Sequence, residues 1–154
     1  MSIQFLERTH AMKFLVICHG NINRSPACAA VLQRMGHDVN SAGFVNPGKL
    51  AAGKMRRAMK ARGYDLEYHR SKLITQKQVD WADKVVLMDS GNARRFAAAF
   101  PDDVGKVTRL GDHANPPVVR IPDPNYMAEA SEKFLPVVTL IMDASLRLGR
   151  EGAV

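Results

Sequence analysis

A cysteine and an arginine with five residues between them occur in the sequence CHGNINRSP, which starts at Cys18 and contains Arg24. The stretch follows an apolar run, and Ser25 with Pro26 begins a segment of helical pattern, since a hydroxyl followed by an early proline is typical of a helix start. A loop wrapped around a helix N-terminus turns backbone N–H groups inward, where they and the helix dipole attract an anion. The stretch therefore predicts a phosphate-binding loop.

The side chains of this loop suit an attack on phosphorus. The planar guanidinium of Arg24 matches two oxygens of a phosphate, and Cys18, facing the same nest, is expected to be a thiolate near neutral pH. A thiolate beneath a bound phosphate is a nucleophile, and the hydroxyl of Ser25 can donate to its sulfur. Gly20 is expected to relieve the tight bend, because glycine tolerates backbone angles that other residues avoid. A buried, unreactive cysteine is the alternative, which the surrounding pattern disfavours.

The elements that must position this loop alternate between strand and helix. Apolar runs predict strands at 12–18, 38–44, 83–89 and 105–110, and periodic patterns predict helices at 27–35, 50–62, 75–81, 92–100 and within 128–149, where Pro136 begins or bends part of the last helix. Such alternation is typical of an α/β fold, a three-layer open sandwich in which a four-stranded parallel sheet carries helices on both faces.

Ligands of open parallel sheets bind beyond the carboxyl ends of the strands. Cys18, Ser41, Asp89 and the loop after Leu110 all lie at the carboxyl ends of predicted strands. We therefore expect these residues to converge at one edge of the sheet and to form a site there.

The composition bounds the size and the compartment of the protein. At 154 residues, 46% of them apolar, the chain suffices for one well-buried core, and it shows no repeat or linker, so we predict one domain over 12–150 after a loose extension over 1–11. No stretch approaches the roughly 20 apolar residues of a membrane helix, and the first residues lack the apolar segment of a secretion signal. Two cysteines cannot build a disulfide framework, which favours a cytoplasmic location.

The net charge of +7 is unevenly distributed, because between residues 54 and 72 lysine and arginine strongly outnumber Asp65 and Glu67. A nucleic-acid patch, a solvated helix face and attraction of phosphorylated substrates are three interpretations of this segment. We favour the solvated face, with which the third interpretation is compatible. We expect neither a nucleic-acid partner nor membrane association.

Several ordered motifs resemble those of low-molecular-weight protein tyrosine phosphatases. The segment VICHGNINRSPACAAVL resembles the family's loop C-x-G-N-[IT]-C-R-S-P. The family's second strand resembles NSAGF, and its H-x-[AS]-R/K segment resembles YHRSKLI. Its M-D-x-x-N turn resembles VVLMDSGN, and its aspartate–proline loop resembles IPDPNY. The resemblance extends over nearly the whole chain after Met12. It implies a flavodoxin-like fold of the phosphotyrosine phosphatase I type and hydrolysis of phosphomonoesters through a phosphocysteine, without metal or cofactor.

The resemblance also implies roles for single residues. Cys18 is then the nucleophile, Arg24 holds the phosphoryl oxygens, and Asp123 is the general acid, although an aspartate before proline is also a common turn residue. Asp123 can protonate a departing phenolate and afterwards, as carboxylate, activate water. The expected phosphate-binding residues are His19, Gly20, Asn21, Ile22, Asn23, Arg24 and Ser25. The residues expected to support the loop are Asn21, Ser25, Ser41, His69 and Asp89. The alternative for His69 is a surface histidine, and the alternative for Ser41 is a turn hydroxyl.

The chain departs from the family pattern at several positions. Asn23 replaces the family's second loop cysteine, which can pair with the nucleophile and protect it from oxidation, and Cys28 is expected to lie in the core, too far away to form that disulfide. His19 replaces a small or apolar residue, and both a substrate contact and a merely exposed ring remain open. Two aromatic residues of the family's cleft are absent, and Phe44 or Tyr126 are candidates to replace them.

These observations favour a phosphatase acting on phosphotyrosine in proteins, with inorganic oxyanions as inhibitors. A phosphatase of phosphoarginine or of small phosphate esters is the main alternative, but arginine phosphatases usually carry threonine at the position of Ile22. An arsenate reductase would need further thiols. A non-catalytic anion-binding module would need neither Cys18 nor Asp123.

Overall fold

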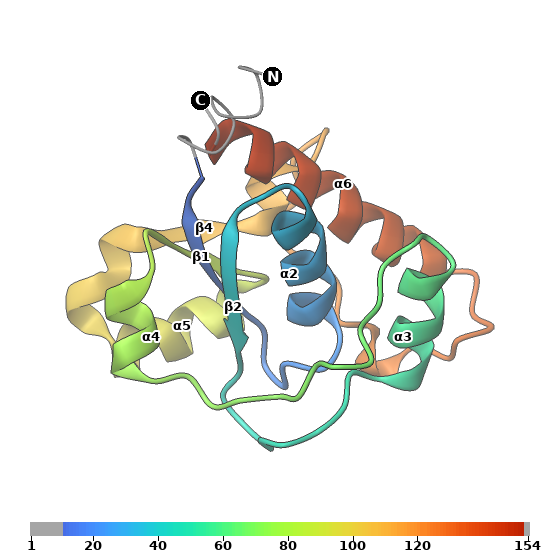
Figure 1. Ribbon diagram of the computed structural model, residues 1–154, viewed down its shortest axis with the longest axis horizontal. Helices are drawn as coiled ribbons and strands as arrows, with labels where there is room; N and C mark the ends of the chain where they lie inside the picture. The colour runs from blue at the N-terminus through green and yellow to red at the C-terminus, as the bar shows by residue number, and fades with distance from the viewer. Residues whose placement is uncertain (1–10, 153–154) are drawn as a thin grey trace.

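The computed structural model describes residues 11–152, in which four strands form one parallel sheet. The strands are β1 (Lys13–Ile17), β2 (Asp38–Ala42), β3 (Lys84–Leu87) and β4 (Val107–Arg109). They lie side by side in the order β2-β1-β3-β4, and Val16 of β1 pairs with both Ser41 and Val86 (Figure 1). The predicted four-stranded parallel sheet is confirmed. The predicted extension over 1–11 lies, except for Ala11, outside the described residues.

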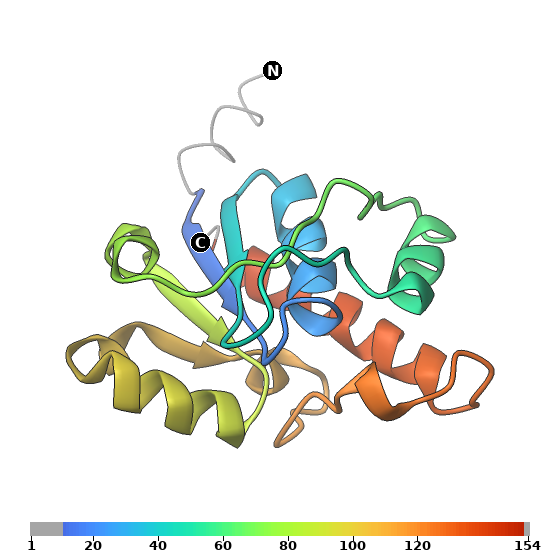
Figure 2. The ribbon, with the colours of Figure 1, turned by 90° about the horizontal axis from the view of Figure 1, so that it is seen from below.

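Helices cover both faces of the sheet, as the alternating pattern predicts (Figure 2). One face carries α2 (Arg24–Arg34), α3 (Gly53–Lys60) and α6 (Phe134–Gly152), and the other carries α4 (Gln76–Trp81) and α5 (Ser90–Ala99). Side chains of β1 explain this arrangement: Phe14 and Val16 pack in the core beneath α2 and α6, whereas Leu15 and Ile17 pack against α4 and α5. A strand that is buried on both faces must be apolar throughout.

Most elements lie within three residues of their predicted bounds, and three of the differences have a physical reason or change an element's first residue. Pro101–Lys106 forms a 3₁₀ helix (η1), so β4 is shorter than the strand predicted at 105–110. Helix α3 begins at Gly53 rather than at residue 50. Helix α6 begins at Phe134, which places Pro136 in its first turn, where a missing N–H breaks no helical hydrogen bond. The remaining short elements are the 3₁₀ turns η2 (Leu110–His113) and η3 (Pro124–Tyr126).

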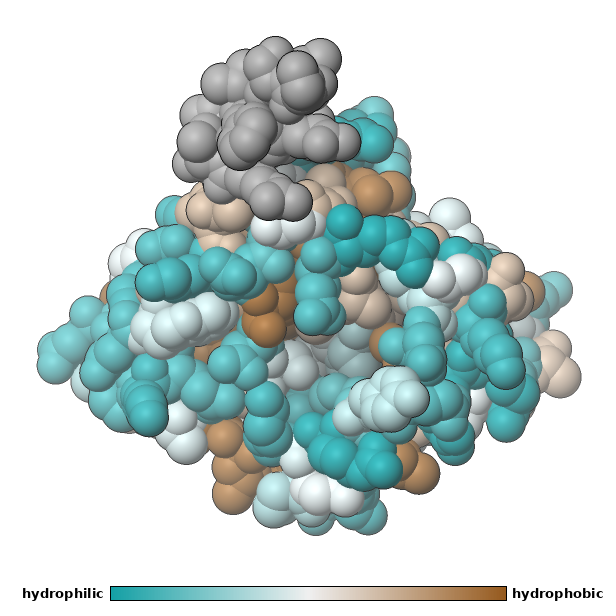
Figure 3. All heavy atoms as spheres, in the orientation of Figure 1, coloured by the Kyte–Doolittle hydropathy of each residue, from teal (hydrophilic) through white to brown (hydrophobic). Residues whose placement is uncertain are grey.

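The surface in the view of Figure 3 is mostly hydrophilic, and its hydrophobic residues form small separate areas. Within residues 11–152, none of the helices has the length and apolar character needed to cross a membrane. All four strands run in the same direction, and in Figure 2 their carboxyl ends converge near the middle of the view, where the loops that follow them meet.

Candidate active site

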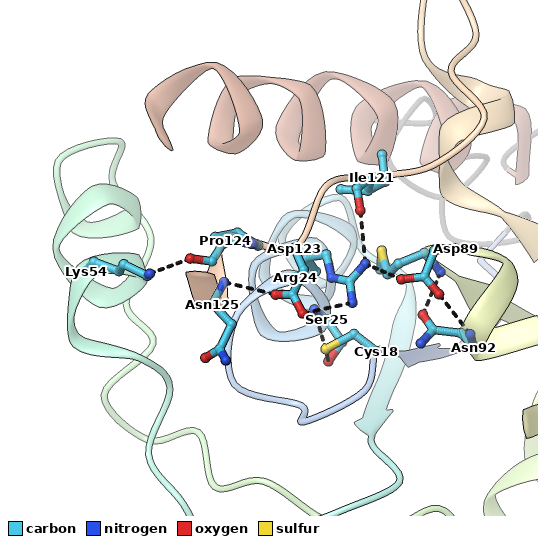
Figure 4. Close-up of polar contacts among 11 residues, drawn as sticks. Cys18, Arg24, Ser25, Lys54, Asp89, Asn92, Ile121, Asp123, Pro124 and Asn125 are labelled. Atoms are coloured by element: carbon cyan, nitrogen blue, oxygen red, sulfur yellow. Dashed lines mark hydrogen bonds and ion pairs between the residues drawn. The ribbon is translucent and has the colours of Figure 1, made fainter. Parts of the chain in front are cut away.

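Cys18 follows directly on β1 at the carboxyl edge of the sheet, and its side chain is 3% exposed. Its Sγ lies 3.0 Å from Oγ of Ser25 and accepts the Ser25 N–H at 3.4 Å (Figure 4). Because Nδ2 of Asn21 donates to the same Oγ at 2.7 Å, the hydroxyl proton of Ser25 is left for the sulfur. The Ser25 hydroxyl is therefore placed to donate to the sulfur. Helix α2 begins at Arg24, three residues before the predicted 27–35, with Asn23 as its N-cap.

Asn21 takes the unusual backbone conformation of the loop, with φ of 56°. Asparagine tolerates this left-handed region, and its side-chain amide and its carbonyl oxygen have partners here. Besides the bond to Ser25, Oδ1 accepts the N–H of Lys72 at 3.0 Å, and the carbonyl oxygen lies 2.6 Å from Nε2 of His69. The prediction that Gly20 relieves the bend is wrong, because Gly20 lies outside the left-handed region and the bonds to Asn21 fix the turn one residue later.

His69 lies beneath the loop as a donor. Burial lowers its pKa, as do the positive charges of Lys72 and Arg70, and the hydrogen bond to the Asn21 carbonyl offsets part of this effect. The neutral imidazole then carries its proton on Nε2 and donates it to that carbonyl. Ser41, which was also predicted to support the loop, does not line the pocket that contains Cys18 but lines a neighbouring pocket together with His69.

The guanidinium of Arg24 is 2% exposed and is held at three points. Nη1 donates to Oδ2 of Asp89 at 2.8 Å and to the carbonyl oxygen of Ile121 at 2.9 Å, and Nη2 lies 3.6 Å from Oδ2 of Asp123. The buried Nε of Arg24 has no hydrogen-bond partner among the described residues. Because buried donors are nearly always paired, this N–H is suited to an oxygen of a bound anion.

Asp89 fixes Arg24 from the N-terminus of α5. Its Oδ1 accepts the N–H of Asn92 at 2.8 Å and caps the helix, while Oδ2 faces Arg24. Burial raises the pKa of Asp89. The hydrogen bonds from Arg24 and from the N–H of Asn92, together with the charge of Arg24, lower the pKa by more than burial raises it, so the net shift is downward. Asp89 is therefore a carboxylate at neutral pH and neutralises the buried cation.

Asp123 lies on the loop before η3 and faces the same pocket as Cys18. Its Oδ1 accepts the N–H of Asn125 at 3.0 Å, and its Oδ2 is the oxygen near Arg24. The loop is tied to the sheet just before it, because the N–H of Ile121 donates to the carbonyl of Met88 at 2.9 Å. The carboxyl group is thus held by its own turn.

A pocket of about 360 Å³ brings these side chains together. Its lining comes from the phosphate-binding loop, from the loop after β2 and from the turn around Asp123, and comprises Cys18, His19, Gly20, Ile22, Asn23, Arg24, Val45, Asn46, Lys49, Asp123, Asn125 and Tyr126. Of the two aromatic candidates, Tyr126 lies at the pocket and is 89% exposed, whereas Phe44 packs against the core on the α5 side. His19 is exposed at the pocket, and Asn21 and Ser25 are buried beneath it.

Val45, Asn46 and Lys49 form a wall of the pocket in the loop FVNPGKL, where the sequence places a cleft wall, but only Phe44 of that loop was named as a candidate. Gly43 lets this wall approach the phosphate-binding loop, because a Cβ at its position would lie 2.9 Å from the carbonyl oxygen of His19. That oxygen also accepts the N–H of Phe44 at 2.8 Å. The close approach at Gly43 joins residues that are distant in the sequence, so the sequence did not show which side chains of this loop line the pocket.

Cys28 is buried in the core and is a free thiol, as predicted. Burial raises its pKa to about 12, a hydrogen bond with Ser145 lowers it somewhat, and the charge of Cys18 raises it. The thiol therefore stays protonated and unreactive at neutral pH.

The pocket combines a buried thiol, a buried guanidinium and a carboxyl group. This set can bind an oxyanion, attack its central atom and transfer a proton to a leaving group. Within residues 11–152, no group of three or more His, Cys, Asp or Glu side chains is placed to hold a metal ion.

Comparison with known proteins gives relatives of matching fold. The chain is 33% identical over 116 residues to a protein-arginine-phosphatase of Geobacillus stearothermophilus, covering 68% of this chain and 78% of that protein. It is 32% identical over 130 residues to the low-molecular-weight protein-tyrosine-phosphatase Wzb of Escherichia coli K12, covering 82% of this chain and 86% of that protein. The structure of Vibrio vulnificus Wzb in complex with benzylphosphonate superposes with a TM-score of 0.83 at 28% identity, covering 91% of this chain and 98% of that one.

The family model described as low molecular weight phosphotyrosine protein phosphatase matches residues 13–151, a span that contains the whole sheet and every residue of the pocket. With this match, and with relatives that carry the same fold over nearly their full length, the chain belongs to the low-molecular-weight phosphotyrosine protein phosphatase family.

Proposed function

We propose that this protein hydrolyses phosphotyrosine in proteins through a phosphocysteine intermediate. One observation carries the proposal: the buried thiol of Cys18 and the unpartnered Nε of Arg24 belong to the same pocket. A nucleophile beside a donor suited to an oxyanion is what phosphoryl transfer to sulfur requires.

In the first step, the thiolate of Cys18 attacks phosphorus, and a sulfur–phosphorus bond forms as the ester P–O bond breaks. Arg24 and the N–H groups of the loop hold the non-bridging oxygens, on which negative charge is spread. Asp123, as the acid, gives its proton to the departing phenolate oxygen, so the product leaves as neutral tyrosine.

In the second step, Asp123 as carboxylate takes a proton from water while the water oxygen attacks phosphorus. The sulfur–phosphorus bond breaks, inorganic phosphate forms, and Cys18 returns as the thiolate. The hydroxyl of Ser25, 3.0 Å from Sγ, stabilises that leaving group.

The pocket walls favour an aryl ester. Ile22, Val45 and Tyr126 supply apolar surface for a ring, and the similar Vibrio vulnificus protein binds benzylphosphonate, in which a phosphonate is carried on a benzyl group. Phosphoarginine is the second candidate, because the Geobacillus stearothermophilus relative is a protein-arginine-phosphatase. Rates with one peptide that carries either phosphotyrosine or phosphoarginine separate the two, and faster release from phosphoarginine would reverse the assignment.

The variant Cys18→Ser tests the covalent step. It should lose aryl-phosphate turnover but still bind sulfate or phosphate, because Arg24 and the loop N–H groups remain. Cys28→Ala, which removes the buried core thiol, is the matched control and should retain turnover in the protein that stays folded. Substantial turnover by Cys18→Ser would end the covalent hypothesis.

We further propose that phosphate, sulfate and vanadate compete with the substrate. The free state of both cysteines is compatible with the cytoplasmic location predicted from the sequence, which remains a prediction. The absence of a nucleic-acid or membrane partner also remains a prediction.

A further inference from the structure

Lys54 joins helix α3 to the turn that carries Asp123. Its half-buried ammonium group donates hydrogen bonds to the carbonyl oxygens of Pro124 and Met127, which bracket η3, and Figure 4 shows the side chain reaching from α3 to Pro124. Its Nζ also lies 5.8 Å from the centre of the Phe134 ring, at the start of α6. One cation on α3 therefore contacts both the turn after Asp123 and the start of α6, which are distant from α3 in the sequence.

The two sides of Asp123 are anchored differently. On the N-terminal side, the N–H of Ile121 donates to the carbonyl of Met88, and the carbonyl of Ile121 accepts a hydrogen bond from the Arg24 side chain. On the C-terminal side, the polar bonds of the turn are local: the N–H of Met127 donates to the carbonyl of Pro124, and the N–H of Asn125 donates to Asp123 itself. Local bonds shape this turn, whereas the bonds from Lys54 attach it to a helix.

We propose that Lys54 is a positioning residue for Asp123, an inference that rests on the proposed function. It fixes the turn whose Asn125 N–H orients the Asp123 carboxyl group, and so keeps the acid at the leaving-group oxygen. A catalytic group that is displaced by about 1 Å can lose roughly 10²-fold in rate. Lys54 acts through Asp123 and does not line the pocket.

The variant Lys54→Met keeps the length of the side chain and removes the ammonium donor. We expect kcat/KM to fall roughly 10- to 100-fold for phenyl phosphate and to change less than about twofold for p-nitrophenyl phosphate, whose better leaving group needs less help from an acid. Lys54→Arg, which keeps donors for the carbonyls, should recover part of the loss. Arg57→Met is the matched control on the same helix, because Arg57 ties α3 to Glu129 beyond the turn through an exposed ion pair, and it should leave both rates unchanged.

Two further measurements separate positioning from a general loss of structure. In the Asp123→Asn background, Lys54→Met should have little additional effect, since the group that it positions is already disabled. Amide hydrogen exchange at Met127 should be faster in Lys54→Met than in the wild type, because the turn opens more often.

The outcomes decide between the two hypotheses. A wild-type protein without aryl-phosphate turnover would refute the proposed function, and faster exchange at Met127 in Lys54→Met would still support the attachment of the turn by Lys54. Equal losses for the two leaving groups, an undiminished loss in the Asp123→Asn background, or unchanged exchange at Met127 would each overturn the inference.

Discussion

Asp123 and Arg24 face each other in the pocket, with Oδ2 of the carboxyl group 3.6 Å from Nη2 of the guanidinium. The proposed acid therefore lies beside the cation that is proposed to hold the phosphoryl oxygens. In the proposed mechanism, this contact places Asp123 beside the phosphoryl group whose ester oxygen it protonates. Phosphate binding and protonation of the leaving group are nevertheless separate tasks, and substitutions can distinguish them.

Asp123→Asn should lower kcat/KM for phenyl phosphate by roughly 10²- to 10⁴-fold, because an amide has no proton to give. The loss should shrink for p-nitrophenyl phosphate, whose anion is more stable. The dependence of kcat/KM on the acidity of the leaving group should become steeper in the variant, because the departing anion is no longer protonated. Steady-state rates with the two substrates measure both effects. Unchanged turnover with an unchanged leaving-group dependence would point to another carboxylate, such as the exposed Asp112.

Asp89→Asn should weaken anion binding rather than acid catalysis. The amide can still cap α5, but it accepts more weakly from Nη1 of Arg24 than the carboxylate does at 2.8 Å, so the guanidinium is held less firmly in the orientation proposed to bind the anion. Hydrogen bonds to charged groups contribute about 1.5–3 kcal/mol, so the Kd for sulfate should rise roughly 10- to 100-fold in a calorimetric titration. Asp102→Asn, at an exposed position of η1, is the control and should bind like the wild type. Equal affinities in all three proteins would contradict this role.

The sheet was predictable because its central strands β1 and β3 are short apolar runs bounded by polar residues. The bounds of β4 were not, since Pro101 begins a 3₁₀ helix in a segment whose pattern also fits a strand. The geometry of the loop from Cys18 to Ser25 was predictable because its residues are neighbours in the sequence, and their spacing sets their arrangement around the start of α2.

The supports of the loop were less accessible to sequence reasoning. Lys72 and Ile121 contribute backbone groups, which no side-chain pattern reveals. Lys54 belongs to the basic segment interpreted as a solvated face, and this interpretation is wrong for it, because its ammonium group binds two carbonyl oxygens. Tertiary contacts, rather than residue type, distinguish Lys54 from the exposed Lys60 on the same helix.

Peroxide should inactivate the enzyme irreversibly, because Cys18 has no resolving thiol. Asn23 occupies the position of the family's second loop cysteine, and the raised pKa of Cys28, about 12, keeps that thiol protonated. Asn23→Cys should allow activity to recover after a reductant is added, since a disulfide can form before overoxidation. Activity after peroxide and then dithiothreitol measures this recovery, and full recovery of the wild type would show that Cys18 is protected by another route.

His69 should make the free energy of unfolding depend on pH in the mildly acidic range. Burial, together with the charges of Lys72 and Arg70, lowers its pKa in the folded protein, whereas the unfolded chain keeps the ordinary value of about 6.5. Below that pH the unfolded state binds more protons than the folded state. The contribution of His69 to stability is therefore complete above about pH 6.5 and is lost as the pH falls through the folded-state pKa.

The variant His69→Gln isolates this contribution, because a glutamine amide can donate to the Asn21 carbonyl but does not titrate. Denaturant titrations at about pH 7.5 and about pH 5.5 should show a smaller loss of stability on acidification in His69→Gln than in the wild type. His19→Gln removes an exposed histidine and should keep the wild-type dependence, which controls for the number of histidines. If His69→Gln lost as much stability on acidification as the wild type, the acid sensitivity would arise elsewhere in the protein.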